Sequence, residues 1–334
     1  MHRHYTQKKG EGQYNDGVQI PFAVPGPEGR AFDVVGLGQN SVDYVAVAAT
    51  RPAPNAKQRL DRFACLPGGQ VATAIVACAR LGWRTRYIGS FGDDAPGRLS
   101  RESLTAEGVD IRAARTVPGA TNRLAVILVD ARTGERTVLW HADPALRIGP
   151  MDDASREAAA SGRLLLVDCE DIAAATAAAT AAHQAGIPTI VDIEDVQSAT
   201  HALLREIDAI ISAEQFPAAL TGHADLGRAL DAIEREFRAP LVCVTLGAEG
   251  SLARCGGREI RTAPFFVECV DSTGAGDVFR GALASGCLRW PEGDVETVLA
   301  YANAAAALSC RALGARGGLP SAEQIDDLLE ARSP

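Results

Sequence analysis

The sequence predicts an α/β fold of three α/β/α layers, in which helices cover both faces of a mostly parallel sheet. Short apolar segments of strand length alternate with Ala- and Leu-rich segments of helical periodicity. The strand segments are apolar throughout, which is typical of parallel strands covered on both sides. Two segments, 42–63 and 122–140, break the alternation, are β-like and mixed in polarity, and predict a small separate β-sheet. With 334 residues, 47% of them hydrophobic, the chain has ample material for one large core.

Each element is predicted from its own residues. Residues 32–37 form an apolar strand and residues 71–81 an Ala-rich helix. Pro188 and Pro240 each precede an apolar run, as expected at helix-to-strand turns. Residues 264–270 alternate and are aromatic or β-branched, which predicts a strand, and the helical spacing after it predicts a helix over 278–289. The other predicted strands are 85–90, 164–167, 189–192, 209–212 and 241–246, and the other helices are 99–107, 172–185, 226–237 and 295–310.

Composition restricts the class of protein. Residues 1–30 are polar and rich in Gly, Pro and charge, so we expect a disordered arm that adds little to the core. The net charge of −9, without a sustained Lys/Arg run, favours neither nucleic acid nor a membrane as a partner. The eight cysteines form no CxxC pair, which is typical of a reducing cytosol. Without a signal-peptide core or an apolar run of ~18 residues, we expect a cytoplasmic protein.

The stretch with the clearest chemistry is residues 270–279, Val-Asp-Ser-Thr-Gly-Ala-Gly-Asp-Val-Phe. A Gly-Ala-Gly turn at the start of a helix leaves backbone N–H groups unpaired and directed at one point, which favours an anion such as phosphate. Asp277 stands at the mouth of this nest, where a carboxylate would repel a resting phosphate. A general base that takes a proton from an attacking hydroxyl explains its presence. The alternative is a structural role, in which the helix dipole favours Asp277 and the glycines only turn the chain.

Residues 271–283, DSTGAGDVFRGAL, resemble the second signature of the ribokinase (PfkB) family of carbohydrate kinases. The resemblance extends in the family's order from about residue 32 to residue 322. It implies a ribokinase-like domain over residues 31–334, with a β-sheet lid (about 42–65 and 121–142) that commonly also forms a homodimer surface. It further implies transfer of the γ-phosphoryl group of Mg·ATP to a primary hydroxyl of a small sugar. Gly274, Ala275 and Gly276 would form the anion hole, and Asp277 would be the catalytic base.

A second group of polar residues follows the first predicted strand. Gly36 and Gly38 match the first two glycines of a GxGxxG fingerprint. Ser41 replaces the third, and no helix follows, so a nicotinamide oxidoreductase is disfavoured. Ligands bind at the carboxyl ends of such strands, where Asn40 and Asp43 offer an amide and a carboxylate for adjacent sugar hydroxyls. In the family an Asp just after the first strand binds substrate hydroxyls, and Asp43 matches it. The alternative is a polar turn without a ligand.

The family's first signature, Gly-Gly-x-x-x-Asn, implies further substrate contacts. Gly68 and Gly69, followed by Gln70, precede a predicted helix, where paired glycines allow close approach of the backbone to a ligand. Thr73 stands at the Asn position and lacks the amide's simultaneous donor and acceptor. This departure leaves the identity of the sugar open, including ketoses, aldoses and acidic or sulfonated sugars.

The second lid segment begins with Asn122 and Arg123. Arg123 could meet an anionic group on the substrate, although an arginine on a lid is more often solvated. Thr133-Gly134 is expected to be a hairpin tip. Before this segment, Asp94 in the Gly-rich run 89–97 is expected to cap the next helix.

The resemblance also implies nucleotide contacts on several loops. The run 245–250 resembles the family's nucleotide loop, and Asn303 lies on the helix that flanks the adenine there. Ser212, with Asp192-x-Glu194 upstream and residues 137–141 in the lid, resembles the ketohexokinase branch. The nucleotide-site candidates are Ser212, Thr245, Gly247, Gly250, Thr273, Gly274, Asn303 and Gly314.

The metal site departs from the family pattern. Where the family usually has Asn-x-x-Glu for Mg²⁺ and phosphate, this chain has Ser-x-x-Gln over 212–215. Glu194 or Glu214 would then take over the Mg²⁺ role through water, because Mg²⁺ keeps several of its waters. In relatives, carbonyl groups near the positions of Asp271 and Thr273 hold a monovalent cation, so a K⁺ site is implied here.

Two other functions stay open from the residues. One is a nucleoside kinase on the same fold, which the lid aromatics Tyr44, Phe63 and Trp140 neither demand nor exclude. The other is a catalytically inactive family member with a regulatory role. Intact Asp277 and its glycines argue against the second, whereas the departures at Thr73 and Gln215 leave room for it.

Overall fold

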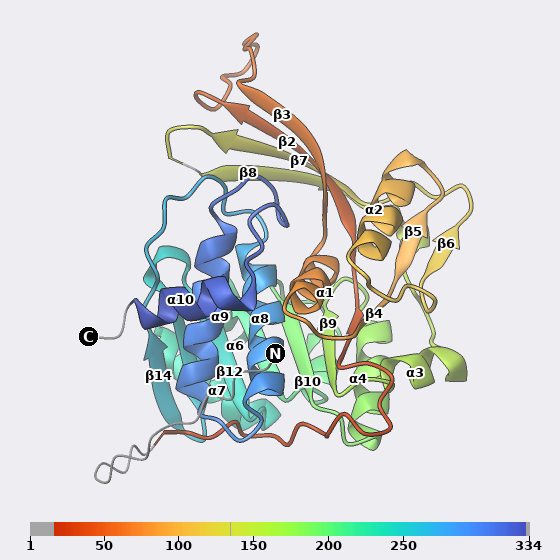
Figure 1. The fold of residues 1–334 in the computed structure, drawn as a ribbon, viewed down its shortest axis with the longest axis vertical. Helices are drawn as coiled ribbons and strands as arrows, with labels where there is room; N and C mark the ends of the chain where they lie inside the picture. The colour runs from red at the N-terminus through yellow and green to blue at the C-terminus, as the bar shows by residue number, and fades with distance from the viewer. Residues whose placement is uncertain (1–16, 134, 332–334) are drawn as a thin grey trace.

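The computed structural model describes residues 17–133 and 135–331. Its body is one large sheet (Figure 1), and six of its eight strands, from β12 to β4, run parallel while β13 and β14 continue it antiparallel. In spatial order the strands are β14 (Arg258–Thr262), β13 (Ser251–Cys255), β12 (Leu241–Thr245), β11 (Ala209–Ala213), β10 (Thr189–Ile193), β9 (Leu164–Asp168), β1 (Val34–Leu37) and β4 (Thr85–Ile88).

Helices cover both faces of this sheet, as predicted, and each face has its own core. Strand residues alternate between the two cores: Leu164 and Leu166 pack on one face, Leu165 and Val167 on the other. Because both faces are buried, apolar residues fill successive strand positions. The first face carries α1 (Gln70–Arg80), α8 (Ala275–Arg289), α9 (Val295–Ser309) and α10 (Ala322–Glu330), and the second carries α3 (Asp153–Ala159), α4 (Ile172–Gln184), α5 (Thr200–Leu204), α6 (Gln215–Thr221) and α7 (Leu226–Phe237).

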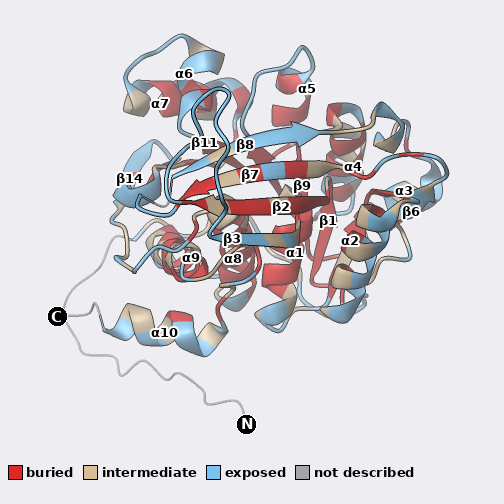
Figure 2. Cartoon of the chain, turned by 90° about the horizontal axis from the view of Figure 1, so that it is seen from above, coloured by how far each residue is buried: buried red, intermediate tan, exposed pale blue. Residues whose placement is uncertain are grey.

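A second sheet, here called the lid, stands off the body (Figure 1), as predicted. Its strands in spatial order are β3 (Arg62–Gly68), β2 (Ser41–Ala48), β7 (Leu124–Asp130) and β8 (Arg136–His141). Figure 2 shows β2 mostly buried and β8 mostly exposed, while β3 is a mixture of exposed and intermediate residues that ends in a buried one. The predicted hairpin tip at Thr133 falls between β7 and β8, and its second residue, Gly134, lies outside the described residues. Beside the lid are α2 (Ala95–Ala106) and a two-stranded pair, β5 (Ser90–Gly92) and β6 (Arg115–Val117).

Two local predictions have opposite outcomes. The cap is confirmed, because the Asp94 carboxylate accepts a hydrogen bond of 2.8 Å from the Gly97 N–H at the start of α2. The predicted strand over 264–270 is wrong: this segment is irregular and no strand pairs with it among the described residues. Its alternation has another cause, since Phe265 packs against the first core while Phe266 is 89% exposed.

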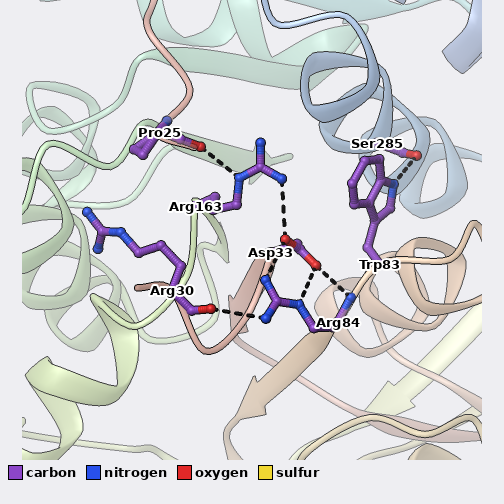
Figure 3. Close-up of polar contacts among 7 residues, drawn as sticks. All are labelled: Pro25, Arg30, Asp33, Trp83, Arg84, Arg163 and Ser285. Atoms are coloured by element: carbon purple, nitrogen blue, oxygen red, sulfur yellow. Dashed lines mark hydrogen bonds and ion pairs between the residues drawn. The ribbon is translucent and has the colours of Figure 1, made fainter. Parts of the chain in front are cut away.

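The expected disordered arm is also wrong for its described part. Residues 17–30 run along the body, and four apolar side chains pack against the first core, at Val18, Ile20, Phe22 and Val24. Figure 3 shows how the arm's end is held: the Arg163 Nε donates to the Pro25 carbonyl at 2.7 Å, and the Arg84 Nη1 donates to the Arg30 carbonyl at 3.1 Å. Asp33 pairs with both of these arginines. Residues 1–16 lie outside the described residues.

Within the described ranges, no helix combines the length and the apolar character that crossing a membrane requires.

Candidate active site

The predicted anion nest lies at the start of α8. Gly274 has φ +77°, and a Cβ there would meet the Ala315 Cβ at 2.6 Å, so both conformation and space require glycine. Asp271, which is fully buried, accepts hydrogen bonds from the Thr273 N–H at 2.9 Å and the Gly314 N–H at 2.8 Å. This carboxylate ties the signature loop to the loop after α9. The start of a 15-residue helix is thereby held in place at a position that suits an anion, although the Ala275 N–H also donates to the Ser272 carbonyl at 3.3 Å.

Asp277 lies in the first turn of α8 and faces a buried arginine. Arg280, only 4% exposed, has its Nη2 at 2.5 Å from the Asp192 Oδ1 and its Nη1 at 3.7 Å from the Asp277 Oδ1. Burial raises the pKa of Asp277 to about 7, the nearby Arg280 opposes this rise, and the carboxylates of Glu194 and Asp43 add to it. A carboxyl group that titrates near neutral pH suits a general base.

A cavity of about 860 Å³ opens between the inner face of the lid and the carboxyl ends of β10, β11 and β12. Parallel α/β sheets bind their ligands at this edge. The cavity brings together most of the predicted site residues. They are Asp43, Gly69, Gln70, Arg123, Glu194, Thr245, Gly247, Gly250, Thr273, Gly274, Ala275, Gly276, Asp277 and Asn303.

The lid side of the cavity combines charged groups with apolar side chains such as Ile127 and Val138. Asp43, 4% exposed, accepts a hydrogen bond of 2.8 Å from the Ser41 hydroxyl, and burial raises its pKa. A Cβ on Gly68 would meet the Asp43 carboxylate at 2.1 Å, so this glycine makes room for the acid. Arg123 is already engaged: its Nη1 lies 2.6 Å from Glu170 and its guanidinium lies 4.4 Å from the centre of the Trp140 ring.

Three predicted substrate residues have protein partners and do not line the cavity. The Asn40 amide donates to the Tyr87 hydroxyl at 2.9 Å and accepts from the Ser100 hydroxyl at 2.8 Å. The Asn122 amide accepts from the Gly92 N–H at 3.0 Å and also donates to the Arg123 carbonyl. The Thr73 hydroxyl accepts from the buried Arg316 at 3.4 Å. These side chains hydrogen-bond to protein groups next to the cavity instead of lining it. Thr73, which replaces the family's Asn, is hydrogen-bonded by Arg316 from the loop after α9.

The two carboxylates predicted for Mg²⁺ differ in position. Glu194 lines the cavity, whereas Glu214 is exposed just before α6 and does not. No cluster of three or more His, Cys, Asp or Glu side chains in the described part of the chain could hold a metal ion unaided. Two buried hydroxyls, those of Ser212 on β11 and Thr273 in the loop before α8, have no hydrogen-bond partner within the described residues. Thr273 lines the cavity, whereas four further predicted residues do not: Gly68, Ser212, Asp271 and Gly314.

The sequence analysis missed several cavity residues, above all arginines. Arg280 follows Asp277 by three residues on a helix, a spacing that places the two side chains together and could have identified it. Arg136 on β8 reaches from the lid to the body, where it donates to the Ser272 hydroxyl at 2.7 Å. Gln39 hydrogen-bonds to Gln70 in the lining. No local sequence signal marks the last two, because their neighbours come from distant segments.

Comparison with known proteins agrees with this geometry. The model of the pfkB family of carbohydrate kinases matches residues 32–322. Ribokinase from Haemophilus influenzae is 27% identical over 300 residues, which cover 88% of this chain and 97% of that protein. A fructokinase from Escherichia coli is 29% identical over 281 residues, which cover 78% of this chain and 91% of that protein.

Among solved structures, Arabidopsis thaliana ribokinase complexed with ribose and ATP superposes with a TM-score of 0.77 at 25% identity. The superposition covers 90% of this chain and 99% of the plant protein. The α/β body, the separate lid sheet and the cavity between them are therefore those of a ribokinase-like fold, and the chain belongs to the pfkB family of carbohydrate kinases, phosphotransferases with an alcohol group as acceptor.

Proposed function

We propose that this protein is an ATP-dependent kinase that phosphorylates a primary hydroxyl of a small sugar, with Asp277 as the catalytic base. The observation that carries the proposal is the setting of Asp277. Its carboxyl group lines the cavity beside the N-terminal amides of α8, and its pKa is raised to about 7. A base and an anion site side by side are what phosphoryl transfer to a hydroxyl requires.

The nucleotide would lie along the part of the cavity lined by Thr245, Gly247, Gly250 and Asn303. ATP itself is supported as the nucleotide by the Arabidopsis relative, which was solved with ribose and ATP. Mg²⁺ bound to the phosphates would supply positive charge, and Glu194 is the cavity carboxylate that could reach it through water. Carbonyl groups near Asp271 and Thr273 would form a site for a monovalent cation such as K⁺.

The sugar would lie under the lid, where Asp43, Gly69 and Gln70 line the cavity. The Asp43 carboxylate accepts hydrogen bonds from two adjacent hydroxyls, and Asp277 takes the proton of the hydroxyl that attacks the γ-phosphorus. The N–H groups of residues 274–276 stabilise the charge that develops on the transferred phosphoryl group. Closure of the lid excludes water, which would otherwise accept the phosphoryl group.

The outer face of the lid fits a homodimer contact. Strand register places Tyr44 between Cys65 and Val126, and Val126 beside Leu139, on the face opposite the cavity. Val126 is 37% exposed, Leu139 58% and Phe63 63%. An exposed apolar face of this kind usually marks an interaction surface, and we propose that a second copy of the lid covers it.

The test is ADP release from Mg·ATP with a panel of ketoses, aldoses, sugar acids and nucleosides, each with and without K⁺. We expect one sugar to stimulate release, and Asp277→Asn to reduce that rate by at least about 10²-fold while ATP still binds. A nucleoside as the only active acceptor would replace the sugar assignment. Retained turnover in Asp277→Asn would contradict the role of Asp277 as the base. Failure of the parent protein to bind ATP would contradict the kinase function.

A further inference from the structure

Arg280 joins two buried carboxylates that lie on different elements. Asp192 lies near the end of β10, and Asp277 lies in the first turn of α8. The guanidinium of Arg280 lies between them, and the Arg280 side chain is 5% exposed. Asp192 is equally buried, and neither of its oxygens has another hydrogen-bond partner among the described residues. Arg280 is therefore the group that compensates Asp192, and the same guanidinium reaches Asp277 with its other terminal nitrogen.

The position of the guanidinium is tightly defined. A Cβ on Gly276 would come within 2.7 Å of the Arg280 Nη1, so Arg280 lies directly against the backbone of the anion nest. Arg280 also belongs to the lining of the cavity. One end of α8 thus presents its amides, the proposed base and a buried positive charge within the first two turns of the helix.

Charged groups on every side bear on Asp277. The acidic groups are Asp43 from β2, Asp192 on β10 and Glu194 just after it, and the basic groups are Arg136 from β8 and Arg280 from α8 itself. The three acidic groups outnumber the two basic ones, and burial also disfavours the negative charge of Asp277. Without Arg280, burial and the neighbouring acidic groups would all favour the protonated form of Asp277, because like charges and a low-polarity surrounding both disfavour ionisation. A base that holds a proton cannot accept one from the substrate.

We propose that Arg280 is a positioning residue for this reaction, which through its bridge to Asp192 fixes the Asp277 carboxylate at the anion nest and keeps it ionised. The proposal rests on the proposed role of Asp277 as base. It assigns to Arg280 no contact with the sugar or the nucleotide, and its effect passes through Asp277.

The test measures the titration of Asp277 in the full chain without substrate, nucleotide or metal. Thermal unfolding is followed from pH 5 to 11 for the parent and for Asp277→Asn, which cannot titrate at this position. A carboxyl group whose pKa is raised by folding stabilises the protein least when ionised. The parent therefore loses stability relative to Asp277→Asn as pH rises above the usual value of 3.8, and the loss levels off above the pKa in the folded state, near 7.

The same pair is then measured with Arg280→Gln in the background. Removing an opposite charge at this distance raises a carboxyl pKa by about one to three units. We expect the levelling-off to move to higher pH by that amount, and Arg280→Lys to restore most of the parent behaviour. An unchanged levelling-off in Arg280→Gln would overturn the proposal.

A matched control comes from the same helix. Arg289, at the other end of α8, pairs with Asp326 at 2.8 Å and is 35% exposed. Arg289→Gln should leave the titration of Asp277 where it is in the parent, and an equal shift in this variant would show a general loss of helix stability instead. If Arg280→Gln does not fold because Asp192 is left uncompensated, the comparison is made between Asp192→Asn and Asp192→Asn/Arg280→Gln, where no charge is stranded.

Activity supplies an independent check once an acceptor sugar is known. Arg280→Gln should move the acid limb of the kcat profile to higher pH, and part of the lost rate should return at alkaline pH, with the KM for ATP little changed. The unfolding and activity measurements test two different proposals, and one proposal can be contradicted without the other. A shifted titration without ADP release from any acceptor would count against the kinase function, whereas normal kinase activity without a shift would count against Arg280 alone.

Discussion

Asp277 meets two demands that oppose each other. A base must be ionised near neutral pH, yet burial at the start of α8 disfavours its charge and raises its pKa. The amides of the anion nest and Arg280 offset this cost without removing it. The site therefore keeps a carboxyl group that destabilises the fold when it is ionised, which agrees with the role of base proposed for it.

Asp43 is the residue that we expect to hold the sugar. Asp43→Ala should raise the KM for the sugar by about 10- to 100-fold, because a hydrogen bond to a charged group contributes about 1.5–3 kcal/mol. ATP affinity should stay close to that of the parent. Asp130→Ala is the control, since Asp130 is a buried lid carboxylate that pairs with Arg132 outside the cavity. Steady-state kinetics with both substrates varied checks this, and an equal effect of the two variants would contradict it.

At the scale of the element, the signature loop is set by its backbone. Gly274 adopts φ +77° and packs against Ala315, so any side chain strains the turn and tilts the first amides of α8. The loop's pattern of glycines and acids is local, which is why the sequence alone predicts a Gly-rich turn at the start of a helix, with Asp277 in its first turn.

Gly274→Ala should weaken ATP binding by at least about tenfold, because displaced amides lose charge-assisted hydrogen bonds to phosphate. Gly257→Ala is the matched control: its φ is +75°, nothing lies within 4 Å of an added Cβ, and it sits in the turn between β13 and β14. Both variants should lose about 1 kcal/mol of stability from the backbone alone. Titration calorimetry with ATP separates them, and equal affinity in the two would refute the role of the nest.

Elements whose signal is periodic could be predicted, and those defined by distant contacts could not. The parallel strands and α7 follow from apolar runs and helical spacing within one segment. The β13–β14 hairpin is absent from the prediction although Gly256-Gly257 marks its turn. Residues 264–270 alternate as a strand does, yet the segment is irregular. Asn40 and Asn122 were placed in the site by residue type, yet their amides are used by neighbours that only the fold brings near.

At the scale of the whole molecule, the lid and the body share one cavity but have different kinds of core. The body buries both faces of its sheet, whereas the lid buries one face, around Val45, Ile127 and Val129, against Leu66 and Leu313. The described N-terminal residues run instead along the body and add apolar contacts there. On the outer face of the lid, by contrast, the apolar side chains of Phe63, Val126 and Leu139 are exposed.

Leu139→Lys should therefore convert a dimer into a monomer, because it places a charge in the middle of the outer apolar face, beside Val126. Light scattering coupled to size exclusion should give about twice the mass of one chain for the parent and the mass of one chain for the variant. Val196→Lys is the control, since Val196 is an exposed apolar residue on the body, 42% accessible. A monomeric parent, or a variant that stays dimeric, would show that this face is not the contact. Because the inner face of the same sheet lines the cavity, we also expect dissociation to raise the KM for the sugar.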